Sequence, residues 1–395
     1  MNFRRGSGRL ASRRTAALAL AALALAGCES TRVAPAADAT VPLEEDERRL
    51  WARAREEEAV LDGGGFLVSD QVAEAYLNGV VRRLQPEPLA GGGQLQVKIL
   101  LDPRLNAFAL PDGAIYIHTG MLARLDNEAQ LATVLGHELT HATHRHGLKG
   151  FRNLKNKTAF MAAFSAGTAG TGALFGAIGA AAAISGYSRD LEREADANGY
   201  RLIVAAGYDS RECPKVFRLL LDESKRSKIP EPFFFGSHPR LEERIASYDQ
   251  LAASGNGAAR PPRTAADDYQ AAVAGLLLRN AAAALSAGDH DSALASVRRR
   301  LALFPDDEAA RLAEAEIHRK RGGPGDVAEA LRLFRDLIGR APDLAEAQRG
   351  LGLLLFKSGD NTAAAAAFQR YLALKPAADD RGYIENYLKL CAPKS

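Results

Sequence analysis

The stretch VLGHELTHATHRHG, residues 134–147, contains four histidines and one glutamate, side chains that bind metal ions and move protons. Leucine and valine recur around them at helical spacing, so the stretch is predicted to be a helix. On a helix, residues four apart lie about 40° apart around the axis and about 6 Å apart along it. The imidazoles of His137 and His141 can therefore reach one ion. Glu138, about 100° to the side, can reach a water on that ion.

This spacing is the HExxH pattern of zinc peptidases. Zinc lowers the pKa of a bound water to about 7 and polarises a carbonyl group, while a neighbouring carboxylate acts as general base. The pattern therefore predicts hydrolysis of peptide bonds, with Glu138 as the base.

The other two histidines of the stretch are not predicted to bind the same ion. His144 lies about 10.5 Å along the helix from His137, which is too far for both to bind one ion. A pair of His141 and His144 is an alternative, but it leaves out His137 and removes the role of the glutamate. The longer pattern HExxHxxGxxH does not fit, since His144 stands where a glycine is needed and a glycine stands where the last histidine is needed. We expect His144 and His146 to lie behind the metal ligands or at the surface.

A catalytic zinc site has three protein ligands and one open position. The best source of the third ligand is SRDLEREADANGYRL, residues 188–202, which is predicted to be a helix. Glu192 and Asp196 lie four apart on one face of it, so that one carboxylate can bind the metal while the other accepts the N–H of a liganding histidine. Glu194 is an alternative ligand, but it points to another side of the helix.

Apolar patterns and turn residues predict the elements around these helices. β-rich runs at 95–102 and 114–120 flank NAFALPDG, residues 106–113, whose Pro-Asp-Gly supplies a turn. Asp70 and Asp126 are predicted helix N-caps, the second for a helix that runs to Gly147. Helices are expected at about 44–61, 70–84, 126–147, 188–206 and 213–225.

The first 28 residues are predicted to be an export signal. Arginines, among them Arg4, Arg5, Arg13 and Arg14, precede an Ala/Leu run, residues 15–27, that is too short to cross a hydrocarbon core of about 30 Å. The run ends in LAGC, which resembles a bacterial lipobox, so Cys28 is expected to be lipidated; an ordinary cleaved signal is the alternative. Residues 29–43 bury almost nothing and are expected to be a flexible tether.

Composition bears on partners and on the membrane. The net charge of +3 is small for 395 residues and the arginines are scattered, so nucleic acid is not expected as a partner. Residues 158–188 contain no charged side chain, which makes a membrane helix one interpretation. Their glycines favour small, close-packed helices, and a hairpin that touches lipid or gates the substrate is a third interpretation. Cys213 and Cys391 could pair in an oxidising compartment if their Cα atoms come near enough, but free thiols are favoured.

The C-terminal third contains an internal repeat. Gly-Asp pairs begin at residues 288, 325 and 359, and Pro305, Pro342 and Pro376 recur with them. The period of about 34 residues resembles a tetratricopeptide array of three repeats with a final helix at 381–390; three unrelated helical hairpins are the alternative. Such stacks leave a concave groove, so we expect residues 266–395 to bind a peptide or a protein. By composition, residues 253–265 are a linker.

Four motifs occur in the order found in the CAAX-prenyl-endopeptidase-like HExxH zinc metalloproteases: NAFALPDGAIYIHTGML, HELTH, EREAD and SHPRLEERI. Residues 46–250 resemble the peptidase domain of this family, and the export signal and repeats resemble its BepA type. The resemblance implies that residues 44–252 form an α+β, minigluzincin-like metallopeptidase domain, mostly helical with a small sheet. An all-α tetratricopeptide repeat domain, residues 266–395, is expected to follow it.

The resemblance also implies roles at the metal. His137, His141 and Glu192 would hold one zinc ion per chain. Glu138 would be the general base, and Asp196 would orient a ligand.

Other residues match family positions around the metal. His238 matches a histidine that lies near the metal and can plug its open position. Arg244 matches an arginine close to the active site, with a catalytic role. Asn106 and Ala107 match the start of an edge strand that aligns the substrate main chain. His118 has no counterpart that we can place.

Together these features predict a zinc endopeptidase of the periplasm that is lipid-anchored to a membrane, with the outer membrane favoured. By resemblance, its substrates are unfolded or misassembled proteins and its role is quality control of outer-membrane proteins, with the repeats docking it to the assembly machinery. A chaperone or scaffold that acts through its repeats, with a plugged zinc site, is the alternative from another class. A membrane-embedded protease that uses residues 158–188 is a third.

Overall fold

The structure, a computed structural model, describes residues 42–87, 89, 93–153, 187–227, 241–254 and 262–392. The predicted export signal with Cys28, most of the tether, nearly all of the uncharged segment at 158–188, and His238 lie outside these residues.

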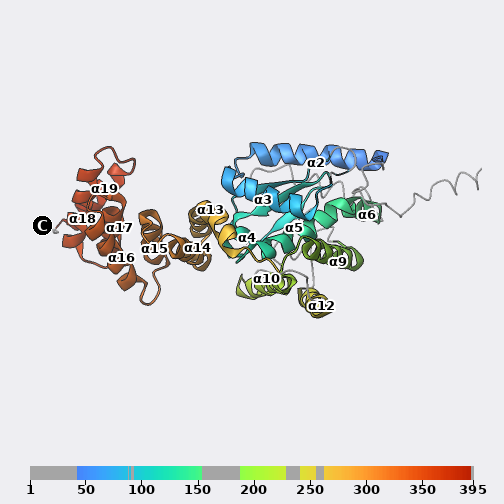
Figure 1. The fold of residues 1–395 in the computed structure, drawn as a ribbon. Helices are drawn as coiled ribbons and strands as arrows, with labels where there is room; N and C mark the ends of the chain where they lie inside the picture. The colour runs from blue at the N-terminus through green and yellow to red at the C-terminus, as the bar shows by residue number, and fades with distance from the viewer. Residues whose placement is uncertain are drawn as a thin grey trace, which may run out of the picture.

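The part of the chain up to residue 254 is mostly helical and contains one small sheet (Figure 1). Its elements are α2 (Glu45–Gly63), α3 (Gln71–Leu84), β1 (Gln96–Leu100), β2 (Ala107–Ala109), β3 (Ala114–His118), α4 (Thr119–Arg124), α5 (Glu128–Thr143), α6 (His146–Asn153), α9 (Arg189–Ala205), the short 3₁₀ helix η2 (Ser210–Glu212), α10 (Cys213–Ser227) and α12 (Leu241–Ser254). The predicted fold class, α+β with a small sheet, is confirmed.

The three strands lie in the order β1, β3, β2, with β1 parallel and β2 antiparallel to β3. Leu67 forms a bridge with Leu100, so the segment before α3 covers the outer edge of β1. Within the described residues, β2 pairs only with β3 and is the edge strand. β1 and β3 each lie inside the run predicted for them.

The sheet separates two apolar layers. Ile99, Ile115 and Ile117 belong to a core shared with α3, α5 and α10, whereas Leu100 and Tyr116 pack with α2. Figure 1 shows α2 on one side of the sheet and α5 on the other. Every residue of α5 is buried, since α9 and α10 pack against it as well. The helix with the HExxH pattern is therefore the central helix of this part of the chain.

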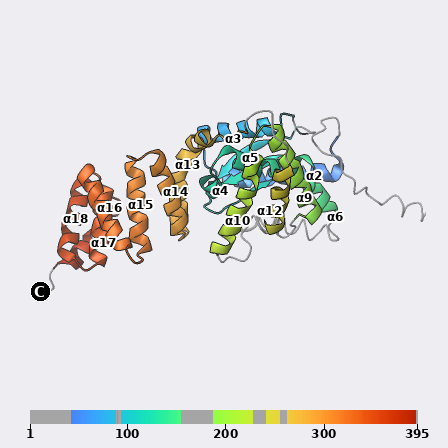
Figure 2. The ribbon, with the colours of Figure 1, turned by 60° about the horizontal axis from the view of Figure 1, so that its bottom comes forward.

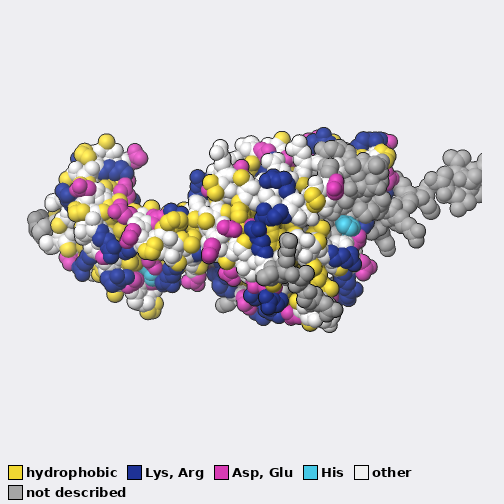
Figure 3. All heavy atoms as spheres, in the orientation of Figure 1, with side chains coloured by type: hydrophobic (Ala, Val, Ile, Leu, Met, Phe, Trp, Pro, Cys, Tyr) yellow, Lys and Arg dark blue, Asp and Glu magenta, His cyan; other side chains and the backbone are white. Residues whose placement is uncertain are grey.

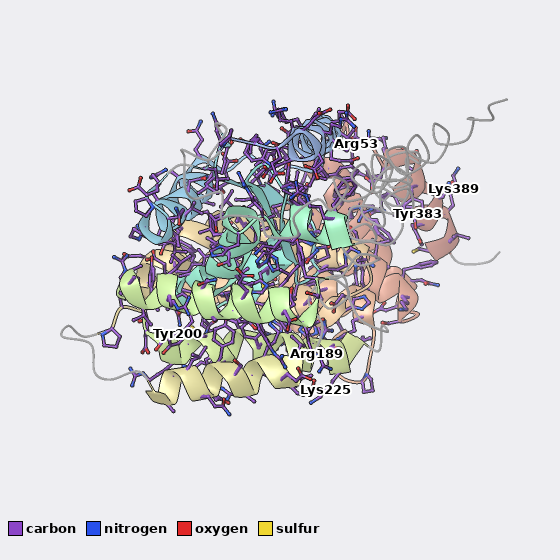
Figure 4. All side chains as sticks on the ribbon, turned by 90° about the vertical axis from the view of Figure 1, so that its right-hand side faces the viewer. Arg53, Arg189, Tyr200, Lys225, Tyr383 and Lys389 are labelled. Carbon is purple, nitrogen blue, oxygen red and sulfur yellow. The ribbon has the colours of Figure 1, made fainter. Side chains whose placement is uncertain are left out.

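α9 lies alongside α12 (Figure 4). Tyr200 extends from α9 toward α12, where its hydroxyl donates a hydrogen bond to the main-chain oxygen of Leu251 (2.8 Å). This packing places α12, which carries Arg244, next to the helix that carries Glu192 and Asp196.

The helix predicted over residues 126–147 exists, but both of its predicted ends are wrong. Its N-cap is Asn127, whose side chain accepts a hydrogen bond from the N–H of Gln130 (2.9 Å), so the first turn starts one residue later than expected. At the other end α5 stops at Thr143.

The cause of the early stop is a tertiary contact at Arg145. This residue has a φ of 55°, in the left-handed region that residues other than glycine rarely adopt. Its Nε lies 2.9 Å from Oε1 of Glu47 on α2, and both side chains are buried. This buried ion pair turns the chain, and a separate helix, α6, starts at His146.

The C-terminal part is all helical, as predicted, and consists of three hairpins and a last helix. Their helices are α13 (Ala266–Ser286) with α14 (His290–Leu303), α15 (Glu308–Arg321) with α16 (Asp326–Arg340), α17 (Ala345–Lys357) with α18 (Asn361–Leu374), and α19 (Arg381–Cys391). Gly288, Gly325 and Gly359 form the turn inside each hairpin with φ of 78°, 83° and 86°, which explains their recurrence. Figure 2 shows the hairpins stacked in a row that leads away from the rest of the molecule.

The first hairpin is joined to the part of the chain before residue 254 by buried contacts. Tyr269 of α13 is fully buried, and its hydroxyl donates to a main-chain oxygen of α4 (2.7 Å). Asn280 accepts a hydrogen bond from the hydroxyl of Thr119 (2.9 Å), and both residues are buried. In the predicted linker, 253–265, the first two residues belong to the end of α12. At its other end, residues 262–265, Arg263 forms main-chain hydrogen bonds of 3.0 Å with residues 207 and 209. This end of the linker is thus held against the domain that precedes it.

Two further predictions concern the two cysteines after residue 28 and a membrane helix. Cys213 and Cys391 are both unpaired and buried, in separate cores, as expected. None of the helices in the described ranges combines the length and apolarity needed to cross a membrane. The uncharged segment, for which a membrane helix was one interpretation, lies almost wholly outside those ranges.

Candidate metal centre

The crossing of α5 and α9 depends on two glycines. A Cβ on Gly199 of α9 would lie 3.1 Å from both the carbonyl carbon of Gly136 and the main-chain nitrogen of His137. A Cβ on Gly136 would lie 3.3 Å from the oxygen of Gly199. The main chains of the two helices are therefore in direct contact, one residue away from His137. This contact brings the histidines of α5 within reach of the carboxylates of α9.

Three side chains converge beside this crossing. The Nε2 atoms of His137 and His141 lie 3.0 Å apart, and the Glu192 carboxylate lies 3.6 Å from the first and 3.4 Å from the second. All three residues are buried, and one ligand atom from each lies within 4.8 Å of the other two. In a tetrahedron with bonds of about 2.0 Å, neighbouring ligand atoms are about 3.3 Å apart. The two imidazoles and the carboxylate therefore fit a zinc ion in both spacing and chemistry.

A buried polar network surrounds His137. Its Nδ1 lies 3.0 Å from Oδ1 of Asp196, so that with Nε2 turned to the metal, Nδ1 carries the hydrogen and donates it to this carboxylate. Arg244 donates two hydrogen bonds to Asp196 (2.6 and 2.9 Å), and its Nη1 lies 3.3 Å from Glu192. The hydroxyl of Tyr248, one helical turn after Arg244, also donates to Asp196 (3.2 Å). Arg244 thus links the carboxylate behind His137 to the carboxylate of the ligand set.

The charges in this network suit metal binding. Burial and the charge of Arg244 lower the pKa of His137 to about 4, which keeps the imidazole neutral, as a ligand must be. Burial alone would raise the pKa of Asp196, but Arg244 and His137 outweigh it and hold that pKa well below its usual range. Asp196 is therefore ionised and can orient His137.

Glu138 is almost fully buried and follows His137 on α5. Near it lies Tyr187, whose pKa is raised by burial and then by the charges of Glu138 and Glu192. The ring of Tyr187 stacks on that of His141, with centroids 3.9 Å apart and planes at 23°. Sequence reasoning missed this residue, because it stands alone just before α9 and belongs to no motif.

The remaining candidates are spread around the centre. Asn106 immediately precedes β2 and Ala107 is its first residue; both are buried. Glu194, the alternative ligand, instead pairs with Lys149 (3.2 Å). His144 lies 3.2 Å from Asn198 and outside the ligand cluster.

His118, which had no assigned role, lies at the end of β3 with its Nδ1 3.6 Å from Asp102. The prediction for His238 falls outside the described residues.

Comparison with known protein families gives two matches. Residues 72–252 match peptidase family M48, and residues 324–379 match a tetratricopeptide repeat family. Residues 72–252 form an M48 metallopeptidase domain. The candidate metal centre lies inside this M48 domain, since its ligands come from α5 and α9.

Relatives of the M48 domain occur in bacteria and eukaryotes. The chain is 25% identical over 196 residues to the beta-barrel assembly-enhancing protease of Escherichia coli K12, a stretch that covers 47% of this chain and 40% of the relative. It is 35% identical over 125 residues to the mitochondrial metalloendopeptidase OMA1 of Arabidopsis thaliana, a stretch that covers 32% of this chain and 25% of the relative. It is 26% identical over 204 residues to the mitochondrial metalloendopeptidase OMA1 of Schizosaccharomyces pombe, a stretch that covers 52% of this chain and 60% of the relative. Each match thus spans less than two thirds of the relative.

The glycine contact predicts a specific effect of substitution. Gly199→Ala places a methyl group against the main chain next to His137, so α5 and α9 must separate. We expect a loss of about 1–3 kcal/mol in the free energy of unfolding, measured in urea, together with weaker metal binding. Gly79→Ala in α3 is the control, because its Cβ would meet only the ends of arginine side chains, at 3.7 and 3.8 Å. If the two variants had the same free energy of unfolding and the same metal affinity, the close crossing of α5 and α9 would not be needed for stability or for the metal site.

Proposed function

We propose that this protein is a zinc-dependent endopeptidase that hydrolyses peptide bonds in unfolded or misassembled proteins. The observation that supports it best is the buried cluster of His137, His141 and Glu192, with Glu138 adjacent on the same helix, inside an M48 domain. When bound, zinc supplies an activated water and polarises the scissile carbonyl.

Three residues of the chain then have separate roles in proton transfer and in positioning the ligands. The carboxylate of Glu138 accepts a proton from the attacking water and passes it to the leaving nitrogen. Asp196 accepts the Nδ1 hydrogen of His137 and holds the tautomer in which Nε2 faces the metal. Arg244 keeps Asp196 ionised and in place through its two hydrogen bonds.

An extended substrate would bind along β2. The N–H of His118 donates a hydrogen bond to the oxygen of Asn106, and the N–H of Leu110 donates one to the oxygen of Ala114. These hydrogen bonds show which main-chain groups of the segment point toward β3. By the alternation of an antiparallel pair, the N–H and C=O groups of Ala107 and Ala109 point away from β3. Ala109 is the more exposed of the two. Pairing there uses main-chain hydrogen bonds, which accept many sequences and suit unfolded proteins as substrates.

The proposed location is the periplasm, with the chain tethered to the outer membrane by lipid on Cys28. The arginine-rich start, the short apolar run and the LAGC sequence support it. The E. coli relative is named a beta-barrel assembly-enhancing protease, and the M48 and repeat domains support a similar role in outer-membrane protein quality control.

The repeats would bring the enzyme to its clients or to the outer-membrane assembly machinery. Stacked helical hairpins present a continuous concave surface that takes a peptide or a protein. Figure 3 shows a hollow between the last repeats and the M48 domain. A partner bound there would lie beside the peptidase, because the first hairpin is fixed to α4 through Tyr269 and Asn280.

Chelation tests this proposal. The purified protein is expected to cut unfolded casein into internal fragments, identified by mass spectrometry, and a chelator is expected to stop the cleavage. One equivalent of zinc per chain should restore it, because the three ligands are already in place. Undiminished cleavage by protein shown to be metal-free would exclude the mechanism.

A further inference from the structure

His146 lies against a metal ligand only because the helix breaks before it. Residues five apart on a continuous helix are separated by about 500°, so His146 would point about 140° away from His141. The left-handed residue Arg145 turns the chain instead, and the Nδ1 atoms of His141 and His146 lie 3.0 Å apart. Backbone strain of this kind persists only where the surroundings enforce it. Here the buried ion pair of Arg145 with Glu47 does so.

The contact continues beyond His146. His146 is fully buried, and its Nε2 lies 3.3 Å from Oε2 of Glu194. Glu194 in turn pairs with Nζ of Lys149 on α6 (3.2 Å). A chain of polar contacts therefore runs from His141 outward to an ion pair near the surface, since Glu194 is about one third exposed.

The direction of these hydrogen bonds follows from the ligand geometry. Nε2 of His141 faces His137 and Glu192, so it is the atom that offers a lone pair to a metal. Nδ1 of His141 then carries the ring hydrogen and can donate it. Nδ1 of His146 accepts, which leaves the hydrogen of His146 on Nε2, the atom that lies 3.3 Å from the Glu194 carboxylate.

We propose that His146 is a positioning residue for the metal centre: it fixes the ring and tautomer of His141 as Asp196 does for His137, and Glu194 anchors it from behind. This inference rests on the proposed metal site. It separates His146 from His144, whose Nε2 contacts Asn198 and which takes no part in the chain of contacts. It also explains the left-handed conformation of Arg145, since without that turn His146 would not reach His141.

A matched pair of amide variants tests the role. In His146→Asn the side-chain oxygen can occupy the place of Nδ1 and still accept from His141, whereas in His146→Gln the amide reaches toward Glu194 and no longer places an acceptor at Nδ1 of His141. We expect the Gln variant to bind zinc about 10–100-fold more weakly in a chelator competition, and the Asn variant to stay close to wild type. The visible spectrum of the cobalt-substituted protein should change in the Gln variant only. His144→Gln is the control and should alter neither readout.

The outcomes separate the two proposals. If wild-type protein binds no metal, the proposed function fails. If wild type binds zinc tightly and both amide variants bind it equally well, the positioning role is wrong. Thermal unfolding of the metal-free variants shows whether they fold. If the Gln variant does not fold, weak zinc binding and an altered cobalt spectrum in the Asn variant would overturn the proposal, because that variant keeps the acceptor.

Discussion

Glu138→Gln is expected to leave the metal in place and to reduce cleavage of an unfolded protein by about 10²–10⁴-fold, the usual contribution of a general base. Glutamine has nearly the same shape, and Glu138 is not one of the three converging ligands. The amide cannot accept the proton of the attacking water, so hydrolysis slows while the fold and the metal remain. Initial rates on fluorescently labelled casein, with metal content measured on the same sample, give both quantities.

Glu243→Gln on α12 is the matched control for this substitution. It removes the same charge from the same domain, but its side chain is about half exposed and its two ion pairs, with Arg189 (3.8 Å) and Arg193 (4.0 Å), are long. We expect its activity and metal content to equal those of wild type. Full activity of the Glu138 variant would show that another group is the base.

Glu192→Gln is expected to lose the metal, whereas Asp196→Asn should keep it with about 10–100-fold lower affinity. The two carboxylates lie four residues apart on α9 and carry the same charge, but only Glu192 faces both Nε2 atoms. Asp196 faces Nδ1 of His137, on the other side of the ring. Zinc titration against a chromophoric chelator measures both affinities.

The comparison of these two variants decides which carboxylate is the ligand. A larger loss in the Asp196 variant would reverse the assignment, and equal small losses would place the third ligand elsewhere. Unfolding of the metal-free variants in urea is the control. It is needed because Arg244 lies between the two carboxylates, and either substitution removes one of its partners.

The sequence predicted the parts of the centre that follow from helical periodicity. His137 with His141, and Glu192 with Asp196, are pairs four residues apart, and the structure places each pair on one face. Which carboxylate faces the metal was left open by spacing alone. It depends on how α9 is rotated against α5, which the contact of Gly136 with Gly199 sets. Neither glycine had a predicted role at this crossing.

Features that arise from tertiary contacts could not be read from local patterns. The helix of the HExxH motif ends early because Arg145 pairs with Glu47, nearly a hundred residues away, and only this break brings His146 to His141. The docking of the first repeat likewise depends on Tyr269 and Asn280, whose partners lie in α4. In the sequence both are ordinary residues of a repeat helix.

The most direct test is the metal content of the purified protein. Elemental analysis after gel filtration is expected to find one transition-metal ion per chain, zinc by this account, and none in the Glu192 variant. Wild-type protein that is folded, and that still contains no stoichiometric transition metal after incubation with zinc, would contradict the account at its centre.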